Sequence, residues 1–296
     1  MKTTRQLTEQ LYLLAAVVIW GSAPVATSAL SSSFSSSWLF FWRLVPTASA
    51  FVLLYIFRSI LQGRIVTPAR GDVGWVRTAA YSIFGGVGYN LFISLALAST
   101  SASSVGIVLT TEPVWIVLIF AWSKKAMPSK RLIVSLVVAI LASTIPLFGG
   151  VAVKGHVVTV IGIAFATFAA ISWALFTAFS DRWRIPAFDK SAQMAIYSAP
   201  VALIAPLIFN GTHPKSILLA NFGEIIVVSL GSNLIAMIFW IKGVASGGAN
   251  LAALYLYLQP IATVFLSSVL LHQPVTLLTI LSLVLVIGSV VNSSLG

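Results

Sequence analysis

The sequence predicts an all-α integral membrane protein with ten transmembrane helices arranged as two inverted five-helix repeats. Three observations lead to this prediction: the chain is apolar throughout, long uncharged stretches separate its few charges, and its second half repeats the first. Of the 296 residues, 59% are hydrophobic and only 8% are charged, and the mean hydropathy is +1.03. An apolar helix of about 20 residues spans the hydrocarbon core of a bilayer, so the chain has room for many spans.

Long uncharged stretches place the predicted spans. No charged residue lies between Glu9 and Arg43 or between Arg77 and Glu112, and none follows Lys242. Each stretch holds one or two helices, and Ser-rich or Gly-rich points divide the longer stretches. Ten segments result, although the same gaps also permit nine or eleven: residues 10–30, 37–57, 73–97, 102–122, 130–149, 157–180, 190–209, 219–241, 248–271 and 275–294.

Turn-forming or charged stretches separate these segments in order. The first two flank "SSSFSSS", and the third runs from a basic stretch to the serines of "STSASS". The fourth and fifth are separated by "SKKAMPSKR", and the sixth and seventh by "DRWRIPAFDK". The eighth ends at a lysine, and "LHQP" divides the last two. Within the sixth segment small residues recur every four positions, which predicts a helix-packing face: Gly162, Ala166, Ala170, Ala174 and Ala178.

The basic residues alternate between the two sides of the predicted membrane. If the amino terminus is cytoplasmic, fourteen of the seventeen Lys and Arg residues lie on the cytoplasmic side and two, Lys154 and Lys215, on the outer side. This excess predicts a multi-pass protein of the cell (inner) membrane with both termini in the cytoplasm. It also accounts for the net charge of +11 without a nucleic-acid partner, because no basic stripe with interleaved aromatics lies outside the spans.

The second half of the sequence repeats the first. A shift of 147 residues aligns "ASTSASSVGIVLTTEPVWIV" with "ASGGANLAALYLYLQPIATV" and pairs Pro113 with Pro260. A shift of 153 residues pairs Trp20 with Trp173. The two shifts keep the same order along the chain, which indicates a duplication.

The duplication predicts two repeats, residues 1–152 and residues 153–296. Each contains five spans, and an odd number of spans inverts the second repeat in the membrane. Many secondary transporters have this architecture, with the substrate site near the bilayer midplane between the halves. The repeat therefore indicates transport.

Motifs along nearly the whole chain resemble those of a known family. They are "VVIWGSAPVATSAL", "FFWRLVPTASAF", "LFISLALASTSASSVGIVLTTEPVWIVLIFAW", "GIAFATFAAISWALFTAFSDRW" and "FWIKGVASGGANLAALYLYLQPIATVFLSSVLLHQPVTLLTILSLVLVIGSVV". In their order they resemble the EamA family of the drug/metabolite transporter superfamily, ten-span carriers made of two EamA repeats. The resemblance implies export or exchange of small metabolites, often amino acids, through a central cavity lined mainly by spans three, four, eight and nine. The Gly-Glu pair that many members carry after spans four and nine is absent from "WSKKAMPS" and "LLHQPV".

Two charged residues lie deep inside predicted spans. Glu112 is about ten residues into the fourth span and Arg43 six or seven residues into the second, both counted from the outer surface. An uncompensated charge at this depth is costly, so each residue indicates either function or a partner. In one interpretation, Glu112 binds the amino group of a substrate or takes up a proton that couples transport. In the other, Glu112 and Arg43 form a structural ion pair between spans two and four.

Pro113 and Pro260 occupy equivalent positions of spans four and nine. Each removes a backbone N–H, so the carbonyls of Leu109 and Leu256 lose their usual partners and the helix kinks. Such backbone survives in a membrane only where protein or a water-filled cavity meets it. The two prolines are therefore predicted to form a hinge or a cavity wall.

Helical spacing adds polar and aromatic candidates for a substrate pocket. Residues that share a helix face can act together, and the candidates are Asn233, Met237 and Trp240 on span eight, Tyr255 and Gln259 on span nine, Trp115 beside Glu112 on span four, and Asn90 on span three. Aromatic walls with a few fixed polar groups are the usual form of a small-molecule site. For the aromatic residues, anchoring at the membrane interface is the alternative.

No motif points to an enzyme, a metal or a cofactor. The sequence has no P-loop, no G-x-S-x-G, no H-E-x-x-H and no acidic cluster, and without cysteine it has no thiol chemistry. The prediction is therefore a secondary transporter that exports or exchanges a small organic metabolite by alternating access, with an amino-acid-like substrate favoured. An uncoupled facilitator or exchanger of another metabolite class is the nearest alternative, and a non-transporting membrane protein or an intramembrane enzyme is less favoured. The sequence specifies neither the substrate nor the oligomeric state.

Overall fold

The computed structural model of the protein consists of helices joined by short turns and loops where it describes the chain. It describes residues 2–69, 74–123, 125, 130–145, 159–180, 185–209, 215–240, 242–243, 255 and 258–294, and these ranges contain no strand. The all-α prediction is confirmed. We call the end of the bundle where α1 ends and α2 begins the outer end, and the opposite end the inner end, following the orientation predicted from the sequence.

The helices of the first half follow the predicted spans and alternate in direction between the two ends. Span three contains a π-helical segment, η1, and span four is interrupted between α5 and α6. α2 ends where Gly63 adopts a left-handed conformation, with φ 58°, that glycine tolerates readily. The elements are α1 (Lys2–Leu30), α2 (Ser36–Gln62), α3 (Gly74–Ser82), η1 (Ile83–Gly88), α4 (Tyr89–Ser99), α5 (Ala102–Leu109), α6 (Glu112–Ser123) and α7 (Lys130–Thr144).

The second half also begins with two long helices, followed by a helical stretch that contains a π-helical segment. Span eight contains a second π-helical segment, η3, and the 147-residue shift maps η1 onto residues 230–235, which lie within η3. The elements are α8 (Val160–Ser180), α9 (Ala187–Ile208), α10 (Lys215–Ala220), α11 (Phe222–Ile226), η3 (Val227–Ile235), α13 (Leu258–Leu271) and α14 (Leu277–Ser294). The first part of the predicted span 248–271, apart from Tyr255, lies outside the described residues.

Six helical stretches of the described chain are long and apolar enough to cross a membrane. They belong to predicted spans one, two, three, six, seven and eight. The other four spans are shorter as described: span four is broken, α7 has 15 residues and α13 has 14, and α14 holds a shorter apolar stretch. The structure therefore shows a multi-pass membrane protein, while the count of ten spans stays a prediction.

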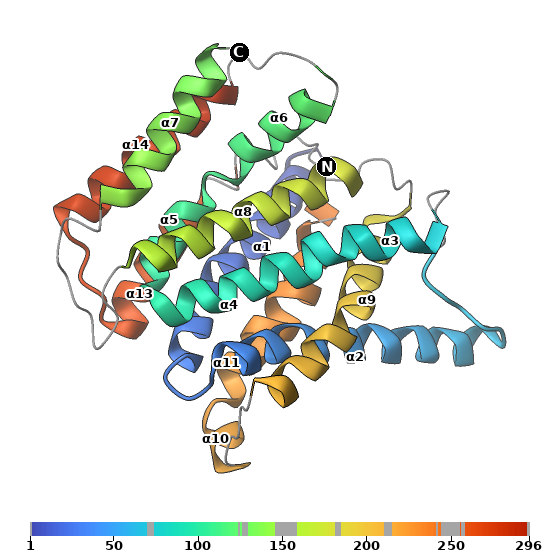
Figure 1. The fold of residues 1–296 in the computed structure, drawn as a ribbon. Helices are drawn as coiled ribbons and strands as arrows, with labels where there is room; N and C mark the ends of the chain where they lie inside the picture. The colour runs from blue at the N-terminus through green and yellow to red at the C-terminus, as the bar shows by residue number, and fades with distance from the viewer. Residues whose placement is uncertain are drawn as a thin grey trace.

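Helices from the first half pack mainly on helices from the second. In the most extensive contacts, α2 lies against α9, α4 against α8, α1 against α13, and α7 against α14 (Figure 1). Contacts made by helices of one half have counterparts in the other. Span one corresponds to span six and span eight to span three, and α1 packs on η3 just as α8 packs on η1. This is the twofold pattern that a duplicated chain would have, although the boundary at residue 152 remains a prediction.

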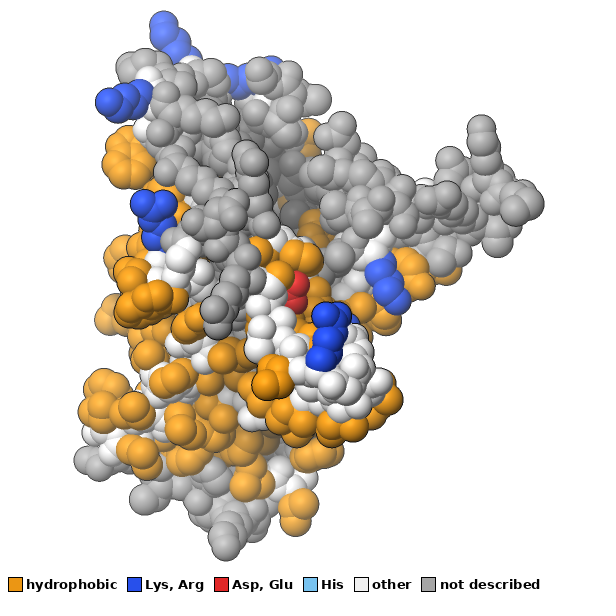
Figure 2. All heavy atoms as spheres, turned by 90° about the vertical axis from the view of Figure 1, so that its right-hand side faces the viewer, with side chains coloured by type: hydrophobic (Ala, Val, Ile, Leu, Met, Phe, Trp, Pro, Cys, Tyr) orange, Lys and Arg blue, Asp and Glu red, His pale blue; other side chains and the backbone are white. Residues whose placement is uncertain are grey.

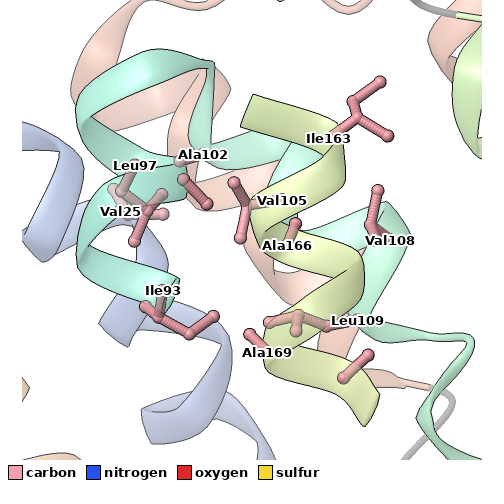
Figure 3. Packing of buried hydrophobic residues seen from close by; sticks show 12 residues of the cluster. Val25, Ile93, Leu97, Ala102, Val105, Val108, Leu109, Ile163, Ala166 and Ala169 are labelled. Atoms are coloured by element: carbon pink, nitrogen blue, oxygen red, sulfur yellow. The ribbon is translucent and has the colours of Figure 1, made fainter. Parts of the chain in front are cut away.

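The largest apolar cluster lies between spans one, three, four and six. Figure 3 shows side chains of α1, α4, α5 and α8 meeting there, among them Val25, Ile93, Val105 and Ala166. Small residues allow this close packing: Ala166, Ala170 and Ala174 are fully buried, as the four-residue period predicts. The cluster fixes the outer half of span four against span six, directly beside the break that follows Leu109.

Large apolar side chains cover much of the outside of the bundle. Leu53 is 64% exposed, Leu207 76% and Leu277 80%, and exposed apolar area on this scale marks a surface that contacts a membrane or a partner. Figure 2 shows the face where α2 ends and α3 begins, with hydrophobic side chains over much of its described surface and Lys and Arg side chains among them. We attribute the apolar surface to contact with lipid.

Candidate functional site

A cavity of about 260 Å³ lies between the two halves of the chain. Its walls come from α1, α2, η1, α4, α5, α6, α8, α9, η3 and α13, so spans one, two, six and seven contribute as well as the expected three, four, eight and nine. The lining continues toward the inner end as far as Thr177 and Trp240, near the inner ends of their helices. Seven of the predicted site residues face it: Arg43, Asn90, Glu112, Asn233, Met237, Trp240 and Gln259.

A buried guanidinium occupies the outer part of this cavity. Arg43 is 3% exposed; its Nε donates to Oδ1 of Asn90 at 2.9 Å and its Nη1 donates to Oγ1 of Thr27 at 2.9 Å. Asn233 donates to the backbone carbonyl of Arg43 at 3.2 Å. Neutral partners from spans one and three therefore hold the guanidinium, Asn233 of span eight holds the backbone of Arg43, and Nη2 has no hydrogen-bond partner among the described residues.

Arg43 and Glu112 do not form the ion pair that the sequence allowed. The hydrogen bonds of Arg43 go to Asn90 and Thr27, and Oε1 of Glu112 is buried without any hydrogen-bond partner in the described part of the chain. Similar depth along two helices does not bring side chains into contact, because the lateral distance depends on how the helices pack. The cavity thus contains one cationic and one acidic side chain that do not neutralise each other directly.

The break in span four lies at Glu112. α5 ends at Leu109, two turn residues follow, and α6 begins at Glu112 with Pro113 as its second residue. The hydroxyls of Thr110 and Thr111 donate back to the carbonyls of residues 107 and 108 at 2.6 and 2.7 Å and help to end α5. The interruption that Pro113 predicts is therefore present, and it opens directly onto the cavity.

Two pairs of aromatic rings form walls of the cavity. The rings of Trp20 and Trp240 lie 5.2 Å apart, and Nε1 of Trp20 donates to the carbonyl of Ser232 at 2.9 Å. The rings of Tyr89 and Trp173 also lie 5.2 Å apart. Since all four residues line the cavity, an enclosed solute would contact aromatic surface contributed by both halves.

Both π-helical segments border the cavity and are held by side chains of neighbouring helices. In η1 the carbonyl of Phe84 accepts a bond from Ser172 at 2.8 Å. In η3 the carbonyl of Ser229 accepts from Thr47 at 3.1 Å. π-Helical turns are rare, and those that occur are often found at functional sites. Their equivalent positions in the two repeats therefore favour a functional role for this region.

Spans one, four and nine pack tightly at the outer side of the cavity. A Cβ atom placed on Gly21 would lie 2.7 Å from Cβ of Ala262, and one placed on Gly106 would lie 2.6 Å from Cγ2 of Thr263. The hydroxyl of Thr263 donates to the carbonyl of Gly21 at 2.9 Å. The helix backbones can approach this closely only because both positions are glycine.

A polar cluster joins spans four and nine at the outer end. The hydroxyls of Ser103 and Ser267 lie 2.7 Å apart, and the hydroxyl of Ser103 donates to Oε1 of Gln273 at 2.9 Å. Gln273 is 5% exposed. Together with the glycine contacts, this cluster separates the cavity from the outer end of the bundle.

Two predicted aromatic residues and one proline lie apart from the cavity. Trp115 donates from Nε1 to Oγ1 of Thr111 at 3.1 Å and packs against the apolar cluster of spans one, three, four and six. Tyr255 is partly buried but does not face the cavity, and neither does Pro260, which is buried in α13 beside Gln259. The candidates on spans three and eight therefore all face the cavity, whereas those on spans four and nine do so only in part.

Four residues of the site were not predicted from the sequence: Trp20, Tyr89 and Trp173, which line the cavity, and Thr27, which binds Arg43. Trp20 and Trp173 were visible as an aligned pair in the repeat, and both line the cavity. Their symmetric placement was therefore a usable signal. Among the described residues, no group of three or more His, Asp or Glu side chains could hold a metal ion.

Comparison with known proteins identifies a transporter family. The sequence profile of the EamA-like transporter family matches residues 7–147 and 160–295. No curated protein sequence matches the chain. A solved structure titled "Crystal structure of protein" is similar over 97% of this chain and 96% of that chain, with a TM-score of 0.61 and 20% sequence identity, which supports the fold alone.

Proposed function

The chain belongs to the EamA-like transporter family, whose profile matches it twice, and from this premise we propose that it is a secondary carrier for a small zwitterionic metabolite resembling an amino acid. The proposed carrier exports or exchanges this solute. One observation supports the substrate class above all: the cavity holds the buried Arg43 and the carboxylate of Glu112, whose Oε1 is buried, and the two are not paired with each other. A zwitterion supplies the missing charge for both.

Arg43 is the proposed binding group for the carboxylate of the substrate. A guanidinium buried without a counter-charge is costly, and a carboxylate bound to its free Nη2 offsets that cost. Asn90, Thr27 and Asn233 hold Arg43 in place before the substrate arrives, so little ordering is needed on binding. These neighbours act as positioning residues.

Glu112 is the proposed binding group for the ammonium of the substrate. Its Oε1 lacks a donor, and an ammonium group provides one. Trp20 and Trp240 extend the same wall, where an aromatic face adds a cation–π contribution of about 0.5–2 kcal/mol. Protonation of Glu112 after the substrate leaves is the proposed route for coupling to a pH gradient.

Alternating access is the proposed mechanism. The polar cluster of Ser103, Ser267 and Gln273 closes the outer end, whereas the lining reaches toward the inner end at Thr177 and Trp240. We interpret this arrangement as a state that loads substrate from the cytoplasm. Separation of spans one, four and nine would then release the substrate outside.

Flux into proteoliposomes tests the proposed function. The purified protein is reconstituted and offered a panel of labelled amino acids, nucleobases and sugars, with empty liposomes as the control. We expect saturable flux of at least one amino acid. If the folded protein moves sugars or nucleobases and no zwitterion, the substrate class is wrong; if it moves nothing, the carrier function itself is rejected.

A further inference from the structure

Hydrogen-bond acceptors without donors gather at the break in span four. Pro113 has no N–H, so it cannot donate to the carbonyl of Leu109, and no described hydrogen bond ends on that carbonyl. The N–H of Val114 donates to the carbonyl of Thr111 at 3.0 Å and leaves the carbonyl of Thr110 without its helical partner. Oε1 of Glu112 is the third such acceptor.

The break therefore has an excess of oxygen atoms beside the cavity. Leu109 and Glu112 both line the cavity. Backbone carbonyls buried at membrane depth must be satisfied, and each unsatisfied group is costly. The C-terminal end of α5, where these carbonyls lie, also carries the partial negative charge of a helix end, which favours a cation.

The geometry points to a binding site for a monovalent cationic group at the break between α5 and α6, composed of the carbonyls of Leu109 and Thr110 and the carboxylate of Glu112. Both an inorganic cation of the size of Na⁺ and a primary ammonium group match this donor-free set of oxygens. In discontinuous membrane helices, unwound carbonyls together with helix ends commonly coordinate such cations. The site deepens the proposed function and rests on it, since an inorganic cation there would compete with the ammonium of the substrate.

The second repeat provides an internal contrast. Pro260 aligns with Pro113, but the residue before it is Gln259, so the equivalent position carries a neutral amide. A cation at that position would lack a counter-charge. We therefore assign the cation site to the break in the first repeat.

Binding is measured without transport, so that failure of this inference and failure of the carrier function are distinguishable. Thermal unfolding of the detergent-purified protein is followed in NaCl, in methylammonium chloride and in choline chloride at equal ionic strength and pH. We expect Na⁺ or methylammonium to raise the melting temperature of the wild type by about 2–4 °C over choline. Stabilisation by both indicates one shared site, and stabilisation by methylammonium alone assigns the site to the ammonium of the substrate.

Matched variants locate the effect. Glu112→Gln removes the charge and keeps the size, so the stabilisation should be lost. Pro113→Ala restores a donor for the carbonyl of Leu109 and should reduce the stabilisation by the cation. Pro260→Ala, the equivalent change in the second repeat, should leave the stabilisation unchanged. The inference is overturned if neither cation stabilises the wild type, or if Glu112→Gln and Pro113→Ala respond as strongly as Pro260→Ala.

Discussion

Replacement of Gly21 by alanine tests the proposed outer closure. The new Cβ would lie 2.7 Å from Cβ of Ala262, 3.0 Å from the carbonyl oxygen of Gln259 and 3.3 Å from the backbone nitrogen of Thr263. Two of these three atoms belong to the backbone, so no rotamer change relieves the contact. Overpacking of this kind costs about 1–3 kcal/mol. If separation of α1 from α13 removes the clash, Gly21→Ala favours the state that is open to the outside.

The size of this shift follows from the cost of the clash. At about 1.4 kcal/mol for each factor of ten, the population open to the outside should rise roughly 5- to 150-fold. A single cysteine measures it cleanly because the chain contains no cysteine of its own. Met237 lines the cavity, so Met237→Cys is the reporter, and a membrane-impermeant thiol reagent applied from the outside reports access.

A glycine with free space around it provides the control. A Cβ on Gly288 of α14 would meet nothing within 4 Å, so Gly288→Ala should leave the labelling rate unchanged. Gly106→Ala, which meets Thr263, should act in the same direction as Gly21→Ala. Labelling of folded Gly21→Ala protein from the outside at the rate of the Gly288→Ala control would refute the proposed outer closure.

Three further predictions concern the cavity. Arg43→Met should weaken the binding of a carboxylate-bearing substrate about 30-fold or more, because removal of one partner of a buried charge pair costs roughly 2–5 kcal/mol. Competition assays with the substrate and its methyl ester measure the two affinities, and an equal loss of affinity for both would contradict the role of Arg43. Glu112→Gln should abolish the response of uptake to a pH gradient and weaken binding of the zwitterion at least about tenfold, so that exchange persists only at raised substrate concentration. A pH response that survives the change would exclude proton coupling through Glu112. Denaturant unfolding of the Arg43→Met/Glu112→Gln double variant should show a loss of stability within about 0.5 kcal/mol of the sum of the two single losses, because the residues form no ion pair. A double variant clearly more stable than this sum predicts would show that the two residues interact.

The helices could be predicted from the sequence to a large extent. Charge gaps and serine-rich turns indicate where the chain leaves the membrane, and for this reason α8 and α9 begin and end within three residues of their predicted bounds, while α2 extends five residues beyond its predicted end. Pro113 marked the interruption of span four, because a missing N–H is a property of the sequence itself. The π-helical segments η1 and η3 were not predicted, since they depend on acceptors that other helices satisfy.

The side-chain partners inside the cavity could be predicted only in part. Depth along a helix can be counted in residues, so Arg43 and Glu112 were correctly identified as deep charges. Their partners depend on lateral packing, and Arg43 is held by Thr27 and Asn90 instead of Glu112. Trp173 escaped notice as a site residue because apolar helices rich in aromatics offer no local sign of which ring faces a cavity.

Transport of a zwitterion and of its singly blocked derivatives tests the central claim most directly. The same proteoliposomes are offered the amino acid with the highest flux, its N-acetyl derivative and its methyl ester. A cavity with one guanidinium and one carboxylate predicts saturable flux of the zwitterion and a loss of at least about tenfold for each derivative. Equal flux of all three solutes, or no saturable flux of any zwitterion, would contradict it.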